Sequence, residues 1–186
     1  RVFYHNAHDI LSLATLAAVL CRAVQRPLEA LQHGEDLFCL GRCYETRGDV
    51  GMAAQLYQQC LRTSLPSKTR QVAMRRLSQM HKRAGEAEQA IAIWTALADR
   101  GDLEACVELA KLYEHRLQDL GRAQAMARRA LELLRQRCYP DRRLLAEVER
   151  RLRRLESRIQ RQRGQRSSAA TGQSTARGVS SDAAAP

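Results

Sequence analysis

A helix-turn-helix pattern that recurs three times between Gly34 and Arg137 constrains the fold of this chain most strongly. Each copy opens with apolar, small and ring-bearing residues at three- and four-residue steps, which place them on one helical face. These series are Leu37, Leu40, Gly41 and Tyr44; Met74, Leu77, Ser78 and His81; and Cys106, Leu109, Ala110 and Tyr113. Each second helix carries an equivalent alanine, at Ala53, Ala90 and Ala123. Self-similarity at intervals of about 35 residues predicts a stack of helical hairpins.

The turns of the copies support the same architecture. Gly48-Asp49 stands between the two helical patterns of the first copy, and Gly101-Asp102 stands between the second copy and the third. Glycine readily adopts the left-handed conformation that ends a helix, and aspartate accepts hydrogen bonds from the first amides of the next. We therefore expect one helix to end and another to begin at each pair.

Residues 34–137 resemble the tetratricopeptide repeat (TPR) family in this pattern. The resemblance implies an all-α, TPR-like α-solenoid of three hairpins, in which the first helix of each hairpin lines a groove. The groove is expected to bind a protein or peptide partner, or nucleic acid. Its charged and polar residues would be Arg42, Arg75, Gln79, Lys82 and Lys111, flanked by Phe38, Glu45, Arg83, Glu114 and His115.

The sequence after the repeats predicts a basic amphipathic helix over residues 138–163 and a disordered tail over residues 164–186. Leu145, Val148, Leu152, Leu155 and Ile159 form one apolar stripe, which suits a helix that caps the solenoid or, alternatively, a short coiled coil. The opposite face is rich in arginine, which indicates either phosphate binding or a solvated surface. The candidate phosphate-binding residues are Arg150, Arg151, Arg154 and Arg158.

The first 26 residues differ from the repeats and carry a second resemblance. His5-Asn6, followed by Asp9-Ile10 and an apolar run, resembles the last motif of the DEDD exonucleases, which have a ribonuclease H-like fold. Together with the repeats, the motif resembles the YprB-like group, in which such a domain precedes TPR hairpins. Residues 1–26 would then be the last helix of a truncated nuclease domain, and residues 27–33 a linker.

This second resemblance implies roles for three residues of the motif. Asp9 would match a metal-binding carboxylate, and His5 or Tyr4 the general base that activates water. The intact exonuclease would need Mg²⁺ or Mn²⁺ held by several carboxylates, and only one of the expected four is present here. We therefore expect this chain alone to be inactive. The alternative is a free-standing TPR adaptor with no nuclease function, in which residues 1–26 are a packing helix.

Composition bounds the remaining possibilities. The net charge of +11 is concentrated in the second repeat and the final helix. No unbroken apolar stretch reaches about 18 residues, so we expect no membrane interaction. The six cysteines show no paired metal-ligand spacing, and we expect them to be reduced, buried side chains in a cytoplasmic protein.

Overall fold

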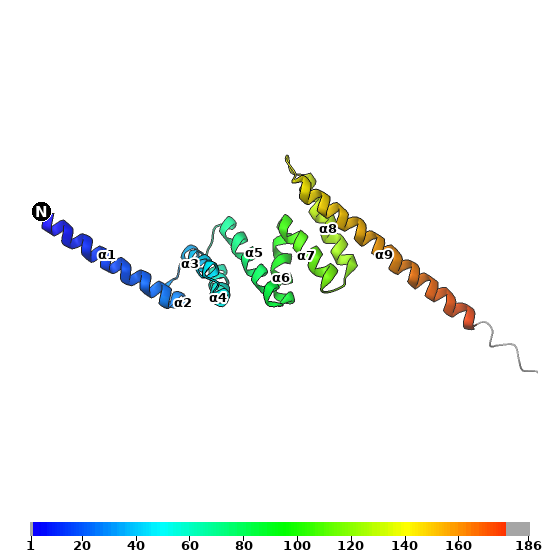
Figure 1. Ribbon diagram of the computed structural model, residues 1–186, viewed down its shortest axis with the longest axis horizontal. Helices are drawn as coiled ribbons and strands as arrows, with labels where there is room; N and C mark the ends of the chain where they lie inside the picture. Colours follow the sequence, from blue (N-terminus) through cyan, green and yellow to red (C-terminus); the bar gives the residue numbers. More distant parts are fainter. Residues whose placement is uncertain (1, 178–186) are drawn as a thin grey trace, which may run out of the picture. The chain divides into compact units, whose positions relative to one another are not determined.

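The computed structural model describes residues 2–177, and side chains from residue 3 to residue 165. Over the described residues it contains nine helices and no strand, as predicted for an all-α chain. The chain divides into two units, residues 1–97 and 98–186, and each unit is described by itself. Figure 1 labels the helices of both units.

The first unit contains two N-terminal helices and two hairpins. The N-terminal pair is α1 (Val2–Gln25) and α2 (Pro27–Ala30), so part of the linker predicted at 27–33 is helical. Proline favours the first turn of a helix, because its fixed φ suits that position and its missing amide has no partner there. The hairpin helices are α3 (Gly34–Arg47), α4 (Val50–Leu61), α5 (Ser67–Ala84) and α6 (Ala87–Ala98), the last residue of α6 belonging to the second unit.

The core of the first unit confirms the repeated face predicted from the sequence. Leu37 of α3 is fully buried with side chains of α4 and α5, namely Ala53, Leu56, Tyr57, Cys60, Ala73, Leu77 and Met80. Gly41 allows the close approach of α3 and α4, since a Cβ on it would lie 2.9 Å from Cε1 of Tyr57. The small residue in the repeat therefore makes room for an aromatic ring.

The predicted glycine–aspartate turns are also confirmed. Gly48 and Gly101 have φ angles of 86° and 78°, in the left-handed region that favours glycine. Asp49 accepts a hydrogen bond from the Met52 amide at 3.0 Å, and Asp102 accepts one from the Ala105 amide at 3.1 Å. Each aspartate satisfies an amide that the helix itself leaves without a partner.

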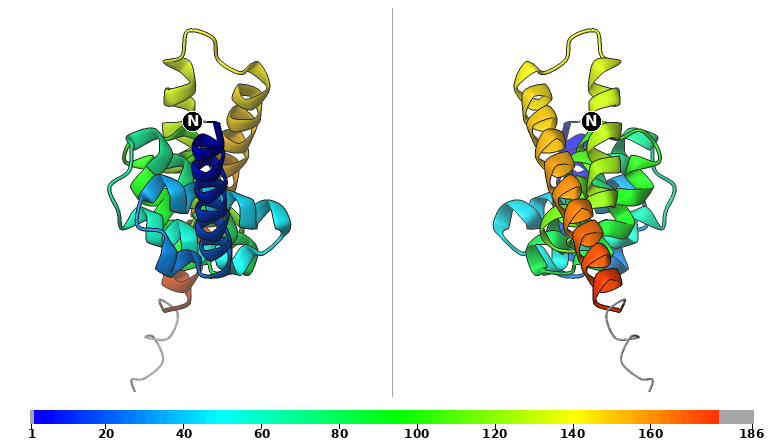
Figure 2. Two further views of the ribbon diagram at one scale, coloured as in Figure 1. Left: turned by 90° about the vertical axis from the view of Figure 1, so that its left-hand side faces the viewer. Right: turned by 90° about the vertical axis from the view of Figure 1, so that its right-hand side faces the viewer.

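The second unit contains the third hairpin and the terminal helix. The hairpin helices are α7 (Leu103–His115) and α8 (Leu120–Arg135), and α9 (Arg142–Arg177) packs along α8 (Figure 2). The apolar stripe of α9 is buried at Val148 and Leu155, whereas Leu152 and Ile159 are half-buried. The stripe therefore faces the hairpin, as expected of a capping helix.

Two expectations differ from the structure. Helix α9 continues to Arg177, so the tail expected from residue 164 is helical over much of its length; residues 164–177 contain no proline to end the helix. Residues 178–186 lie outside the described residues. The cysteines were expected to be buried, but only Cys60 and Cys106 are, because they alone belong to the inward faces of α4 and α7; Cys21, Cys39, Cys43 and Cys138 are exposed.

Candidate partner-binding surfaces

A three-residue polar cluster links the two hairpins of the first unit. Glu45 of α3 accepts hydrogen bonds from the Tyr57 hydroxyl at 2.8 Å and from Nη1 of Arg76 at 2.6 Å. Burial, the hydrogen bond to Glu45 and the charge of Glu45 all raise the pKa of Tyr57, so its proton stays in the cluster. Burial acts to lower the pKa of Arg76, but the hydrogen bond and charge of Glu45 outweigh it and raise that pKa.

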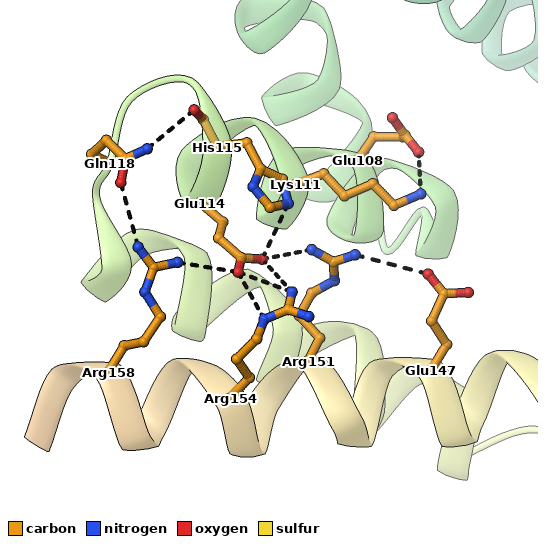
Figure 3. Close-up of polar contacts among 9 residues, drawn as sticks. All are labelled: Glu108, Lys111, Glu114, His115, Gln118, Glu147, Arg151, Arg154 and Arg158. Carbon is orange, nitrogen blue, oxygen red and sulfur yellow. Dashed lines mark hydrogen bonds and ion pairs between the residues drawn. The ribbon is translucent and has the colours of Figure 1, made fainter.

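A larger cluster surrounds Glu114 in the second unit (Figure 3). The Glu114 side chain is 1% exposed and accepts hydrogen bonds from Arg151 at 2.7 Å and Arg154 at 3.0 Å. Arg158 lies 3.4 Å from the same carboxylate. His115 Nε2 is 3.6 Å away on the α7 side. One buried carboxylate of α7 is thus surrounded by three arginines of α9.

The arginines outweigh burial in setting the charge of Glu114. Burial alone would raise the pKa of this carboxyl, but the hydrogen bond and charge of Arg154, with the charge of Arg151, hold the pKa below its usual value. Glu114 is therefore ionised at neutral pH. Because a buried charge needs close partners, the contact fixes where α9 lies on the hairpin.

The two clusters occupy equivalent positions of the repeat. Glu45 lies four residues after Gly41, and Glu114 lies four residues after Ala110. In each unit the arginine belongs to the second helix after the one that carries the glutamate: α5 pairs with α3, and α9 pairs with α7. Helix α9 therefore contacts α7 as the first helix of a further hairpin would. Sequence reasoning placed Glu114 in the groove and missed this contact, although the repeated spacing carried the signal.

The residues predicted to line the groove are divided between the two units. Arg42 is exposed on α3, while Arg75, Gln79 and Lys82 are half-buried on α5 of the same unit. Lys111 belongs to the second unit, where its Nζ lies 2.8 Å from Glu108 Oε1. A single groove formed by all five residues stays a prediction.

Eight of the nine arginines of α9 whose side chains are described fall into two sets, and the ninth, Arg163, lines a hollow between α8 and α9. The inner set, Arg151, Arg154 and Arg158, contacts Glu114, so three of the four predicted phosphate-binding residues have a partner inside the protein. The outer set has no ion pair with any described residue and is exposed; we call it the outer arginine row, and it comprises Arg142, Arg143, Arg150, Arg153 and Arg161. The phosphate-binding prediction itself stays untested.

Helix α1 presents apolar side chains to solvent over most of its length. The exposed large residues are Phe3, Tyr4, Ile10, Leu11, Leu13, Leu16, Val19, Leu20 and Val24. Only its C-terminal end is held, because Ala23 is buried and the Tyr44 hydroxyl donates to the Val24 carbonyl at 2.6 Å. By length and composition, Phe3–Gln25 is the one helix in the described chain apolar enough to cross a membrane, which is weak evidence for a span. Ser12 and Thr15 interrupt the apolar run of this helix, so it contains no unbroken stretch of about 18 apolar residues.

The predicted catalytic residues lie on this exposed helix. Tyr4, His5 and Asp9 occupy its first two turns, and the Tyr4 ring packs edge-on against His8. Across the described side chains, no three His, Cys, Asp or Glu residues come close enough to hold a metal ion. The residues present therefore do not fit a Mg²⁺ or Mn²⁺ site by themselves, and we derive no reaction from them.

Two shallow hollows open between α8 and α9. The larger, of about 510 Å³, is lined by Leu117, Leu120 and Ile159 together with the polar residues Gln118, Asp119, Gln124, Gln162 and Arg163. The smaller, of about 370 Å³, includes Arg128 and Glu156, whose ion pair spans 3.0 Å.

Comparison with known proteins places the chain in a class by its fold. No family model matches it. Among solved structures, PcrH from Pseudomonas aeruginosa aligns with a TM-score of 0.54 at 20% identity, over 66% of this chain and 91% of PcrH. The chain is an all-helical protein with a TPR-like fold.

One curated protein is similar in sequence. The YprB protein of Bacillus subtilis (strain 168) is 24% identical over 135 residues, which is 70% of this chain and 32% of YprB. The chain thus spans about a third of the relative it matches.

Proposed function

We propose that the TPR-like hairpins act as a binding scaffold, in which α3 and α5 of the first unit hold an acidic segment of a protein partner. The exposed guanidinium of Arg42 on α3 carries the proposal, because the resemblance to TPR arrays predicts that the first helix of each hairpin lines the ligand groove. Gln79 and Lys82 on α5 add a hydrogen-bonding group and a second cation. The TPR-like fold supports a protein partner, since stacked hairpins offer extended surfaces for one.

A charge-reversal pair on one helix tests the scaffold. A fluorescent deca-glutamate peptide serves as the probe, and its binding to the chain is followed by anisotropy. Arg42→Glu should weaken binding at least tenfold, whereas Arg47→Glu, an equal charge change at the exposed end of α3, should weaken it less than threefold. Equal losses in the two variants would show that net charge alone attracts the peptide and would refute the scaffold.

We further propose that the scaffold is the C-terminal arm of a ribonuclease H-like exonuclease. The match to a third of YprB and the exposed apolar surface of α1 favour this over a free-standing adaptor. In that arrangement α1 is a core helix of the nuclease domain, and its apolar side chains are buried there. Asp9 and His5 or Tyr4 would then join carboxylates supplied by that domain.

The reading frame upstream of Arg1 tests the nuclease proposal. A further domain's length containing an Asp-x-Glu motif on a strand pattern would support it. Within that longer protein, Asp9→Asn should abolish metal-dependent exonuclease activity while leaving the thermal midpoint unchanged. A start codon close to Arg1 would exclude the nuclease and leave the adaptor.

A further inference from the structure

The arginines of α9 divide according to whether a carboxylate neutralises them. The inner set surrounds Glu114, and further arginines of the second unit have surface partners: Arg122 with Asp119, Arg128 with Glu156 and Arg135 with Glu149. The outer arginine row has no ion pair among the described residues. Apart from Arg163, which lines a hollow beside α8, the unneutralised charge of the described part of α9 is therefore gathered on the side facing away from the hairpin.

The row is regular because of the helical period. Arg143, Arg150 and Arg161 lie seven and eleven residues apart, which returns each to nearly the same side of an α-helix, and Arg142 and Arg153 border them. From Arg142 to Arg161 the row extends about 28 Å at 1.5 Å per residue. The helix is held in place by Val148, Leu155 and the Glu114 contacts, so the spacing of the arginines is fixed before any ligand binds.

The composition of the row favours a phosphate backbone over a protein surface. The residues between the arginines on that side are small or polar, Ala146, Ser157 and Gln160, so a protein would find no apolar anchor. A helix that lies within a membrane interface inserts apolar side chains, and the row has none. Exposed guanidinium groups in a straight line suit phosphates, to which arginine donates paired hydrogen bonds.

We propose that the outer arginine row binds the phosphate backbone of double-stranded nucleic acid without sequence preference. Helix α9 contains no aromatic residue, so the row has no platform on which unpaired bases stack. A rigid row matches the regular phosphates of a duplex better than the variable path of a single strand. This surface is separate from the groove proposed above and does not depend on it.

Two triple variants of equal charge test the proposal. The first removes part of the row, Arg143→Gln, Arg150→Gln and Arg161→Gln. The matched control removes three neutralised arginines of the same unit, Arg122→Gln, Arg128→Gln and Arg135→Gln. Both lower the net charge from +11 by three, and all six positions are exposed, so circular dichroism should show unchanged helix content.

Binding of the full 186-residue chain to 30-base-pair DNA and RNA duplexes is measured between 50 and 300 mM salt. Each phosphate contact contributes about −0.9 to the slope of log K against log salt for DNA. The row variant should bind at least tenfold more weakly and flatten the slope by about 2.7, whereas the control should change affinity less than threefold. Comparable binding to a scrambled duplex is expected.

Several outcomes would overturn the proposal. Equal losses in the two variants would mean that overall charge, and not the row, attracts the duplex. Tighter binding of single strands would contradict the duplex preference. Row-dependent binding of deca-glutamate or of phosphatidylserine vesicles that exceeds duplex binding would assign the surface to an acidic protein or to a membrane instead.

Discussion

Glu114 of α7 and Arg151 of α9 form a hydrogen-bonded ion pair of 2.7 Å across 37 residues of sequence. The pair repeats a contact of the first unit, in which Glu45 meets Arg76 at 2.6 Å across 31 residues. The residues three before and four after Arg151, Val148 and Leu155, are both buried. The residues at the same two spacings from Arg76, Ala73 and Met80, are buried as well. Helix α9 is therefore built on the pattern of a repeat helix, although its sequence predicts only a capping helix or a short coiled coil.

Removing the Glu114 carboxylate should destabilise the second unit. Glu114→Ala leaves Arg151, whose side chain is 12% exposed, without its main partner, and loss of one member of a buried pair costs about 3 kcal/mol. Arg154 and Arg158 are partly exposed and can turn toward water, which limits the cost. Urea denaturation followed by circular dichroism measures the change.

Glu132→Ala provides the control for this prediction. Glu132 is exposed on α8 and makes no ion pair with the described residues, so its loss should change the free energy of unfolding by less than about 0.5 kcal/mol. A Glu114→Ala variant as stable as Glu132→Ala would show that the pair contributes nothing to holding α9.

The stability contributed by Glu114 should disappear in acid. Because the folded protein holds the pKa of Glu114 below its usual value near 4.5, the unfolded chain takes up the proton first as the pH falls. The contribution is complete above about pH 5.5 and is lost as the pH falls through the lowered pKa. The difference in unfolding free energy between the wild type and Glu114→Gln should therefore narrow from pH 7 to pH 3, and a constant difference would contradict the lowered pKa.

A double-mutant cycle should show coupling between Glu45 and Arg76. The pair is partly exposed, at 27% and 36%, so we expect a coupling energy of about 1 kcal/mol, less than for the Glu114 cluster. Tyr57→Phe should lower the free energy of unfolding by about 1 kcal/mol more than removal of an exposed hydroxyl would, because Glu45 loses the hydrogen bond donated by the Tyr57 hydroxyl. Additive single variants would show that the three groups act independently.

The sequence predicted the hairpins better than the contacts between them. The face defined by Leu37, Gly41 and Tyr44 could be predicted because helical spacing alone places apolar residues together. The role of Glu114 was missed, because one carboxylate has the same local pattern whether it faces a groove or a neighbouring helix, and the only signal was that Glu114 and Glu45 occupy equivalent repeat positions. Its burial depends on α9 folding back along α8, which is a tertiary event. The exposure of α1 could not be predicted either, because an apolar run indicates a buried helix but does not show which surface buries it.

The cysteines should separate into two classes of reactivity. Cys21, Cys39, Cys43 and Cys138 are exposed and should react with a thiol reagent within minutes at pH 8. Burial raises the pKa of the Cys60 thiol to about 11, and burial likewise raises that of Cys106, so both should stay protonated and protected. Titration with Ellman's reagent should count four thiols in the native protein and six in urea; six in the native state would contradict the packed hairpins.

Two glycines of the first unit should respond in opposite directions to alanine. Alanine is favoured over glycine in a helix by about 1 kcal/mol, which acts at both positions. At Gly41 the new Cβ would lie 2.9 Å from the Tyr57 ring, which is fully buried and bonded to Glu45, so the ring cannot move away cheaply. Overpacking of this kind costs about 1–3 kcal/mol, and Gly41→Ala should be destabilising by about 1 kcal/mol.

At Gly51 the nearest atom to the new Cβ would be Asp49 Oδ1 at 3.8 Å, an ordinary contact, so Gly51→Ala should be stabilising by about 0.5 kcal/mol. Thermal denaturation of the two variants gives the sign directly. If both substitutions raised the midpoint, the ring of Tyr57 would have to pack elsewhere than against Gly41. Gly41 would then not be needed for the close approach of α3 to α4.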